Sequence, residues 1–403
     1  MRTLPLFCLL IALSIPLTGS YSQSGAPPKL GLTLSGGGAK GLAHIGVLKV
    51  LEEHGIFPDY ITGTSMGSIV GGLYSIGYTP DELEQLATSL NWNRYFNDSY
   101  ARNYLPIDER SKADRYQLSF ALEDGKLKIP RGLIGGKKIL TLFTGLTACV
   151  HNQQSFDEFY RPFRCVATDL ETGEAYVFSE GPLRKGIRAS MSIPSAFDPI
   201  QYDDRLLVDG LLARNLPAQD ARDMGADIVI GVDVGDPLYP RDELTSVLRV
   251  LEQTSSYVMV ESNKKQLELT DWLIDPDLSD YTTLSYDAAD SLIRRGEQAA
   301  LAALPGLTAY LDSVGWQSKP IPDRPNCRRD SFLIKQIVFP SEDEQINRVL
   351  SQLVRWKLPK VVTIQELEQL TAILYSSGFF SQVDYELQYA EGGNYQLDWM
   401  AAP

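Results

Sequence analysis

The sequence contains few cysteines and few histidines. Cys8 lies in the N-terminal segment, and the spacing of Cys149, Cys165 and Cys327 fits no zinc-binding pattern. Three cysteines allow at most one disulfide and one free thiol. The sequence also offers few histidines for a catalytic triad in which a histidine follows the nucleophile. The complete set of histidines is His44, His54 and His151.

Basic residues are also in deficit, because 37 Lys and Arg stand against 51 Asp and Glu and give a net charge of −14. A nucleic-acid-binding protein usually carries a basic face, so that class is disfavoured. After the N-terminal segment, no apolar run reaches the roughly 18 residues that a membrane-spanning helix needs. The length of 403 residues suits two or three domains.

The N-terminus has the pattern of a secretory signal peptide. Arg2 supplies the positive end, residues 4–17 form a short apolar run, and Ser20-Tyr21-Ser22 offers small residues at a cleavage site before Gln23. We therefore expect residues 1–22 to be removed and the protein to be exported. The expected location is the periplasm, the outer membrane or the cell surface.

Strand-like and helix-like segments alternate over residues 29–315. Strands are predicted at 29–35, 163–169 and 227–234, and long helices at 245–267 and 292–314. This alternation favours a mainly parallel sheet with helices on both faces, and hence an α/β fold. A polar, proline-rich linker is expected at 316–330. A separate α+β unit, with the order strand, helix, helix, strand, strand, is expected at 331–403.

Residues 91–160 are harder to assign because they mix aromatic, basic and apolar residues. One interpretation is a lid or a membrane-facing flap. The other, which we favour, is a helical cap with a solvated basic rim.

The motif Gly63-Thr64-Ser65-Met66-Gly67 carries the first chemical signal. It follows a strand-like run and precedes a helix rich in small residues, which is the setting of a G-x-S-x-G nucleophile elbow. The flanking Gly63 and Gly67 allow close packing of the turn, so Ser65 is the candidate nucleophile.

A second glycine-rich segment, Gly36-Gly37-Gly38-Ala39-Lys40-Gly41, lies between the first strand and the first helix. Its amides are candidates to bind the oxyanion of an acyl-transfer reaction. The spacing of Gly36, Gly38 and Gly41 also fits a dinucleotide fingerprint, but the acidic residue Asp59 stands at the wrong end of the second strand. A P-loop is excluded because Gly41, and no Ser or Thr, follows Lys40.

The candidate general base is Asp209, at the end of the apolar run Leu206-Leu207-Val208 and before Gly210. An aspartate there can accept a serine proton directly if it lies within about 3 Å. His151 is the only histidine after Ser65, and its surroundings suggest an ordinary surface residue.

Taken together, these motifs resemble the patatin-like phospholipase family, over about residues 29–311. Two further blocks, 166–173 and 189–194, match as well. The resemblance implies a three-layer α/β/α fold and a Ser65–Asp209 dyad without histidine. It implies an oxyanion loop of Gly37, Gly38 and Ala39, with the Met66 amide as a further donor, and structural roles for Asp169 and His44. The sequence departs from the family at Leu211, where a smaller residue is usual.

The C-terminal unit is similar to a POTRA domain, on the segment 374–383 and on the order of its elements. A signal peptide, a patatin-like domain and a POTRA-like domain in series resemble the bacterial patatin-like autotransporters of type V secretion, without their barrel. The resemblance implies a lipid acyl hydrolase, a phospholipase or esterase, that acts on phospholipid or another lipid ester at a membrane surface, with no cofactor, metal or nucleic acid. The alternative is a non-catalytic outer-membrane interaction protein that binds a peptide strand through the POTRA-like domain.

Overall fold

The structure is a computed structural model. It describes residues 27–96, 121–123, 126–128, 132–235, 238, 240–245, 247–320, 323–329, 331–339, 343–376, 380, 382–390 and 394–402. The expected signal peptide, the middle of the 91–160 segment and the turn at 391–393 lie outside these residues.

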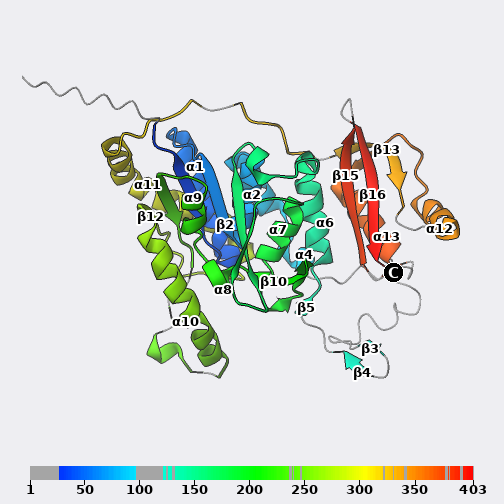
Figure 1. The fold of residues 1–403 in the computed structure, drawn as a ribbon, viewed down its shortest axis with the longest axis horizontal. Helices are drawn as coiled ribbons and strands as arrows, with labels where there is room; N and C mark the ends of the chain where they lie inside the picture. Colours follow the sequence, from blue (N-terminus) through cyan, green and yellow to red (C-terminus); the bar gives the residue numbers. More distant parts are fainter. Residues whose placement is uncertain are drawn as a thin grey trace, which may run out of the picture.

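The larger unit is built on an eight-stranded sheet with the order β12-β11-β1-β2-β6-β10-β9, in which β7 also pairs with β6 (Figure 1). Its strands are β1 (Leu30–Leu34), β2 (Tyr60–Thr64), β6 (Phe163–Asp169), β7 (Ala175–Phe178), β9 (Ile200–Tyr202), β10 (Arg205–Asp209), β11 (Ile228–Val232) and β12 (Trp272–Ile274). Two short pairs lie outside the sheet: β3 (Ala121–Glu123) with β4 (Lys126–Lys128), and β5 (Gly132–Ile134) with β8 (Ser195–Phe197).

The sheet is mixed, which corrects the expectation of a mainly parallel one. Strands β12, β11, β1, β2 and β6 run parallel, as the alternation of strands and helices predicts. Strands β7, β9 and β10 are antiparallel to their neighbours, because short connections return the chain directly to the sheet.

Helices cover both faces of this sheet. Those of the larger unit are α1 (Ala43–Glu53), α2 (Met66–Ser75), α3 (Pro80–Ser89), α4 (Trp92–Tyr95), α6 (Lys137–Leu146), α7 (Leu183–Ser190), α8 (Leu211–Arg214), α9 (Ala218–Asp223), α10 (Val247–Glu268) and α11 (Ala289–Ser313). Shorter 3-10 turns are η1 (Gly38–Leu42), η3 (Ala148–Val150), η4 (Phe156–Glu158), η5 (Arg241–Glu243) and η6 (Tyr286–Ala288).

The alternation of side chains along β2 shows how the layers are divided. Ile61 points to the face where α2 packs, against which Gly71 makes a close approach. Thr62 and Thr64 point to the other face, where their hydroxyls donate to the carbonyl oxygens of Pro217 and Arg214, beside α9 and α8. Because successive residues of a strand face opposite sides, the fold is the expected α/β/α arrangement.

The described part of the 91–160 segment contains a helix that belongs to the core. Ile139, Leu142, Phe143 and Leu146 of α6 are all buried. Their spacing of three and four residues places them on one helix face. This supports the interpretation of a helical cap for α6. The basic side chains expected to form a rim at 126–131 lie outside what the structure describes.

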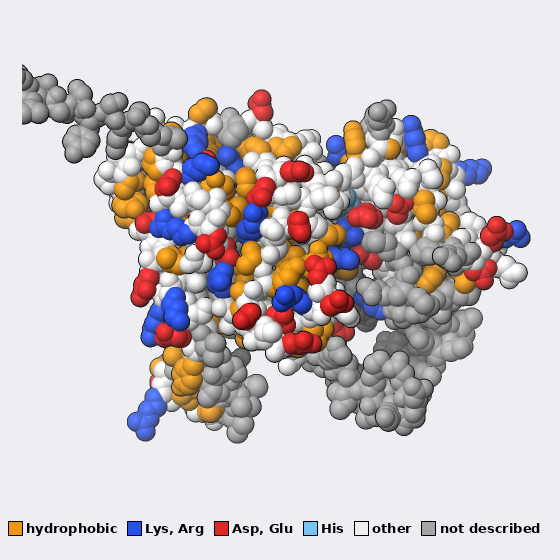
Figure 2. All heavy atoms as spheres, in the orientation of Figure 1, with side chains coloured by type: hydrophobic (Ala, Val, Ile, Leu, Met, Phe, Trp, Pro, Cys, Tyr) orange, Lys and Arg blue, Asp and Glu red, His pale blue; other side chains and the backbone are white. Residues whose placement is uncertain are grey.

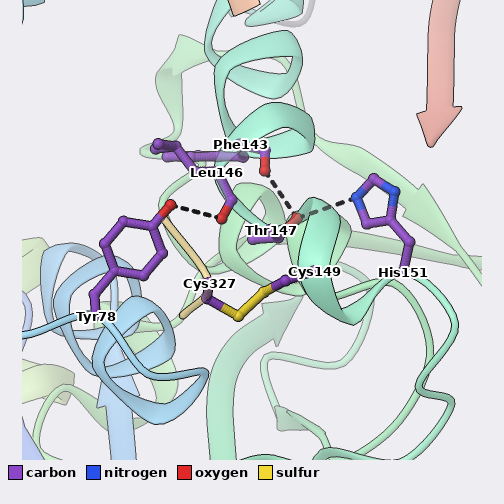
Figure 3. The surroundings of a disulfide bond; sticks show 7 residues. All are labelled: Tyr78, Phe143, Leu146, Thr147, Cys149, His151 and Cys327. Carbon is purple, nitrogen blue, oxygen red and sulfur yellow. Dashed lines mark hydrogen bonds between the residues drawn. A yellow bond between two sulfur atoms is a disulfide. The ribbon is translucent and has the colours of Figure 1, made fainter. Parts of the chain in front are cut away.

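The segment expected to be a linker lies against the larger unit in its described residues, 316–320 and 323–329. Trp316 is buried, Lys319 pairs with Asp59, and Arg324 pairs with Glu52. Figure 3 shows the disulfide that joins Cys327 of this segment to Cys149 of η3. The remaining thiol, Cys165, is free and buried, so the pairing lies within the limit that three cysteines set.

The C-terminal unit has a four-stranded sheet with the order β14-β13-β16-β15. Its elements are β13 (Ser331–Val338), α12 (Glu344–Val354), β14 (Lys360–Thr363), α13 (Ile364–Ser376), β15 (Gln382–Ala390) and β16 (Asn394–Ala402). The predicted order lacked β14, a four-residue strand between the two helices. In the last two strands Tyr385 lies opposite Trp399 and Leu387 lies opposite Leu397, and all four side chains are buried.

The outer edge of β15 contacts the larger unit, beside α6 and η3 (Figure 1). His151 reaches this edge, with its Nδ1 atom 3.2 Å from both the amide nitrogen and the carbonyl oxygen of Leu387. Burial, and then the positive charge of Arg184, lowers the pKa of His151 to about 3, so the imidazole is neutral. The expectation of an ordinary surface histidine is therefore wrong.

Figure 2 shows charged side chains of both signs over the visible face of the larger unit, with apolar side chains between them. This mixture accords with the ordinary charged fraction of the chain, 22%.

Candidate active site

The serine turn joins the end of β2 to the start of α2. Ser65 has a φ of 53° and a ψ of −121°, a backbone conformation that is strained for any residue with a side chain. Gly63 and Gly67 make this sharp turn possible by close approach. A Cβ atom on Gly63 would lie 2.3 Å from the carbonyl oxygen of Gly67, and one on Gly67 would lie 2.3 Å from that of Leu34.

Strand β6 brings Ser65 and Asp209 together. On β6, Val166 pairs with Thr64, the last residue of β2, and Ala167 pairs with Asp209, the last residue of β10. Strand β7 pairs with residues 165–168 of β6 as well. Strand β2 runs parallel to β6 and β10 runs antiparallel to it, so the last residues of β2 and β10 arrive at adjacent positions.

At this junction the hydroxyl of Ser65 donates a hydrogen bond of 2.7 Å to Oδ2 of Asp209. Both side chains are shielded from solvent, with exposed fractions of 4% for Ser65 and 0% for Asp209. The separation lies within the range over which a carboxylate can accept a serine proton directly.

Asp209 is held as an acceptor on both of its oxygens. Oδ2 receives the Ser65 hydroxyl, and Oδ1 receives the amide of Leu211 at 2.9 Å. Burial raises the pKa of Asp209 to about 7, against the lowering effect of these two hydrogen bonds. Leu211 contributes its amide here, so the unusual residue type at this position leaves the hydrogen bond to Asp209 in place.

The glycine loop passes over the serine turn. A Cβ atom on Gly36 would lie 2.9 Å from that of Ser65, and one on Gly41 would lie 2.4 Å from Cγ of Met66. The side chain of Asn215 fixes the start of the loop, because its Oδ1 accepts the Gly36 amide at 3.0 Å. No sequence rule identified Asn215, which follows Asp209 by six residues and belongs to no motif.

Three of the four predicted oxyanion donors are available. Within the described residues, the amides of Gly37, Gly38 and Met66 have no hydrogen-bond acceptor. The amide of Ala39 instead donates to the carbonyl oxygen of Thr283 at 2.8 Å. We therefore leave Ala39 out of the candidate oxyanion site.

An aromatic group lies beside the carboxylate. Burial, and then the negative charge of Asp209, raises the pKa of Tyr286. The ring of Tyr286 lies 4.9 Å from that of Trp92 and 4.8 Å from that of Phe96, centroid to centroid. Tyr286 is distant along the chain and belongs to no motif, so no sequence pattern identified it.

The remaining predicted residues have structural positions. Lys40 is buried in η1, and Gly210 follows Asp209 at the start of α8. His44 is fully buried, its Nε2 atom lies 2.8 Å from the carbonyl oxygen of Ser35, and burial lowers its pKa to about 4. Asp169 pairs with Arg205 at 2.8 Å, which accords with a structural role.

The structure does not favour the dinucleotide interpretation of the glycine loop. Asp59 precedes β2 and accepts the Leu30 amide at 2.9 Å, whereas the glycine loop follows the opposite end of the parallel sheet. In the described part of the chain, no group of three or more His, Cys, Asp or Glu side chains could hold a metal ion. Nor is any helix there both long and apolar enough to cross a membrane.

Residues 32–222 match the family model described as patatin-like phospholipase. A patatin-like phospholipase domain-containing protein of Caenorhabditis elegans is 34% identical over 212 residues, which cover 51% of this chain and 14% of that protein. An uncharacterized NTE family protein of Mycobacterium tuberculosis is 32% identical over 212 residues, covering 53% of this chain and 51% of that protein.

Among solved structures, VipD from Legionella pneumophila aligns with a TM-score of 0.40 and 12% identity, over 70% of this chain and 67% of that one. The chain spans about half or less of the length of these two curated relatives. Residues 32–222 therefore resemble a patatin-like phospholipase domain, and Ser65 and Asp209 both lie within this matched segment.

The strained turn predicts an unusual order of stability among substitutions of Ser65. Ser65→Gly and Ser65→Ala both remove the hydrogen bond to Asp209, but only glycine adopts a φ of 53° easily. We expect Ser65→Gly to be more stable than Ser65→Ala by about 1 kcal/mol in urea unfolding. Ser68 lies in α2, so Ser68→Gly should be less stable than Ser68→Ala. The same order at both positions would contradict the argument.

The raised pKa of Asp209 predicts a pH-dependent cost to stability. The unfolded chain ionises this carboxyl near the ordinary aspartate pKa of 3.8, whereas the folded protein does so near 7. Stability from this residue therefore falls as pH rises from about 4 to 7. Asp209→Asn removes the titration, and should raise the stability relative to the wild type at pH 8 by up to about 4 kcal/mol. The difference in unfolding free energy should shrink by pH 4, and an equal difference at both pH values would refute this account.

Proposed function

We propose that this protein is a serine lipid acyl hydrolase, a phospholipase A or esterase, that works through a Ser65–Asp209 dyad. The observation that carries the proposal is the 2.7 Å hydrogen bond from the Ser65 hydroxyl to a buried carboxylate. Nucleophile and base are within direct reach of each other, so the geometry needs no histidine between them.

In this mechanism Ser65 attacks the ester carbonyl while Asp209 takes the hydroxyl proton. The negative charge on the carbonyl oxygen is then stabilised by the amides of Gly37, Gly38 and Met66. Asp209 returns the proton to the leaving alcohol, and an acyl-enzyme on Ser65 remains. Asp209 next takes a proton from water, which attacks the acyl-enzyme, and it returns this proton to the Ser65 oxygen as the fatty acid leaves.

A lipid substrate is supported by the apolar surroundings of the nucleophile. A small cavity next to the serine turn is lined by apolar side chains alone, among them Met66, Val70 and Leu73 of α2 and Leu83 of α3. Met66, one of the lining residues, directly follows Ser65 in the chain. The match to the patatin-like phospholipase model supports the same substrate class.

We further propose that the protein is exported and that its C-terminal unit is POTRA-like. The apolar N-terminal run supports export, as does the Cys149–Cys327 disulfide, since such bonds persist in oxidising compartments. The outer edge of β15 is occupied by His151 and Asn152. A partner strand in the outer membrane would therefore add at β14, the opposite edge of the sheet.

The dyad predicts a defined loss of activity and a defined pH dependence. Ser65→Ala and Asp209→Asn should each lower kcat on a p-nitrophenyl ester and on phospholipid vesicles by at least about 1,000-fold. Because Asp209 acts as a base with a pKa of about 7, wild-type activity should rise with pH and reach half its plateau near pH 7. A fluorophosphonate should label the wild type and leave Ser65→Ala unlabelled.

Undiminished turnover by Ser65→Ala would rule out the dyad. A folded wild type that does not label, but binds an extended outer-membrane strand peptide, would favour the alternative, a non-catalytic interaction protein.

If the protein is exported, its native form should lack the signal peptide and contain the disulfide. Intact mass measurement without reducing agent should find a chain that begins at Gln23, with Cys149 joined to Cys327. A protein that retains residues 1–22 and carries reduced cysteines would contradict export.

A further inference from the structure

The segment that ends α7 contacts both Ser65 and Asp209. It lies in the block 189–194 that matches the family pattern, but the mechanism gives it no role. The hydroxyl of Ser190 accepts the amide of Ser65 at 2.9 Å and donates to the carbonyl oxygen of Val166 at 2.5 Å. Ser190 therefore links the nucleophile to the β6 residue that pairs with the end of β2.

The same segment also holds the base. The amide of Asp209 donates to the carbonyl oxygen of Ser192 at 2.8 Å, and the amide of Gly210 donates to that of Ser190 at 3.3 Å. One short stretch of chain thus fixes the backbone of both reacting residues. Among these three bonds, the one to Ser65 depends on a side chain, the hydroxyl of Ser190.

The hydrogen bond to the Ser190 hydroxyl restrains Ser65, whose backbone conformation is strained. Ser65 has a φ of 53°, so its backbone would relax if its neighbours allowed it. Its amide is buried, and without Ser190 it would lose a hydrogen-bond acceptor that water cannot readily replace. A relaxed turn would move the Ser65 hydroxyl relative to Asp209.

The segment is itself anchored. The buried guanidinium of Arg188 donates to the hydroxyl of Ser192 and, at 3.0 Å, to the carbonyl oxygen of Gly135. The Ser192 hydroxyl in turn donates to the carbonyl oxygen of Arg188 at 2.7 Å. Arg188 also donates to the carbonyl oxygen of Asp198 at 3.3 Å, so its bonds to Gly135 and Asp198 still anchor the segment when the Ser192 hydroxyl is removed.

We propose that Ser190 is a positioning residue whose hydroxyl holds the amide of Ser65, so that the Ser65 hydroxyl meets the carboxylate of Asp209. This role rests on the proposed hydrolase function for its kinetic consequence. The hydrogen bond between the Ser65 amide and the Ser190 hydroxyl does not depend on that function. The positioning role and the hydrolase function can therefore be tested separately.

The chain supplies a matched control two positions away. Ser190→Ala and Ser192→Ala each remove a fully buried hydroxyl that makes two hydrogen bonds. Of the two hydroxyls, that of Ser190 contacts Ser65, whereas Ser192 reaches Asp209 through its carbonyl oxygen, which Ser192→Ala retains. A general loss of packing would affect both variants alike.

The kinetic test compares both variants with the wild type on a soluble ester, well below their unfolding temperatures. Ser190→Ala should lower kcat and the rate of fluorophosphonate labelling at least tenfold, with KM changed less than twofold. Ser192→Ala should keep kcat within threefold of the wild type. If Ser190→Ala does not fold, Ser190→Cys replaces it and should show an intermediate loss, because a thiol is a weak hydrogen-bonding group.

Wild-type kcat in the Ser190 variant, or an equal loss in both variants, would overturn the proposal. A wild type that neither hydrolyses nor labels would defeat the hydrolase function instead. Amide hydrogen exchange then decides the positioning role by itself. The peptide 60–68 should exchange at least tenfold faster in Ser190→Ala than in Ser192→Ala, and equal exchange would overturn it.

Discussion

The hydrogen bond between Ser65 and Asp209 depends on how the strands of the larger unit pair. It joins two residues 144 positions apart in the chain, and its geometry follows from strand pairing. Strand β2 runs parallel to β6 and β10 runs antiparallel to it, so their carboxyl ends meet over Val166 and Ala167. A purely parallel sheet would send the ends of both strands the same way. In this sheet the antiparallel direction of β10 brings its last residue, Asp209, to Ala167, next to the position where β2 ends.

Two features of the candidate site lower the stability of the fold, and both belong to the proposed reacting residues. Ser65 occupies a strained backbone conformation, and Asp209 is a carboxyl group without access to water. Burial raises the pKa of that carboxyl to about 7, which makes it a far stronger base at neutral pH than an exposed aspartate. Rigid surroundings keep both features in place, namely the close approach of Gly63 to Gly67 and the hydrogen bond from Ser190.

The features predictable from sequence are local ones. The serine turn, the glycine loop and the capping box of Thr79 with Glu82 each depend on residues a few positions apart, and Asp209 is visible because it ends an apolar strand. The missed features depend on long-range contacts. Thr283 accepts a hydrogen bond from the Ala39 amide, Asn215 accepts one from the Gly36 amide, and β15 contacts His151. In each case the two partners are far apart in the chain, so no local pattern predicts the contact. Strand β14 was missed because four residues are too few for a periodic pattern.

Helix α7 shows that the two units form one folded body. At its start, Arg184 is only 1% exposed and lies 3.7 Å from Asp384 and 3.4 Å from Glu386 of β15. A buried guanidinium needs such partners, because a charge taken out of water is costly when it is left unpaired. At its end, Ser190 holds the amide of Ser65. One eight-residue helix thus connects a charge pair with the C-terminal unit to the amide of Ser65. Since Tyr385 of β15 also donates to the carbonyl oxygen of Thr141 in α6, the C-terminal unit packs against the larger unit through both α6 and α7.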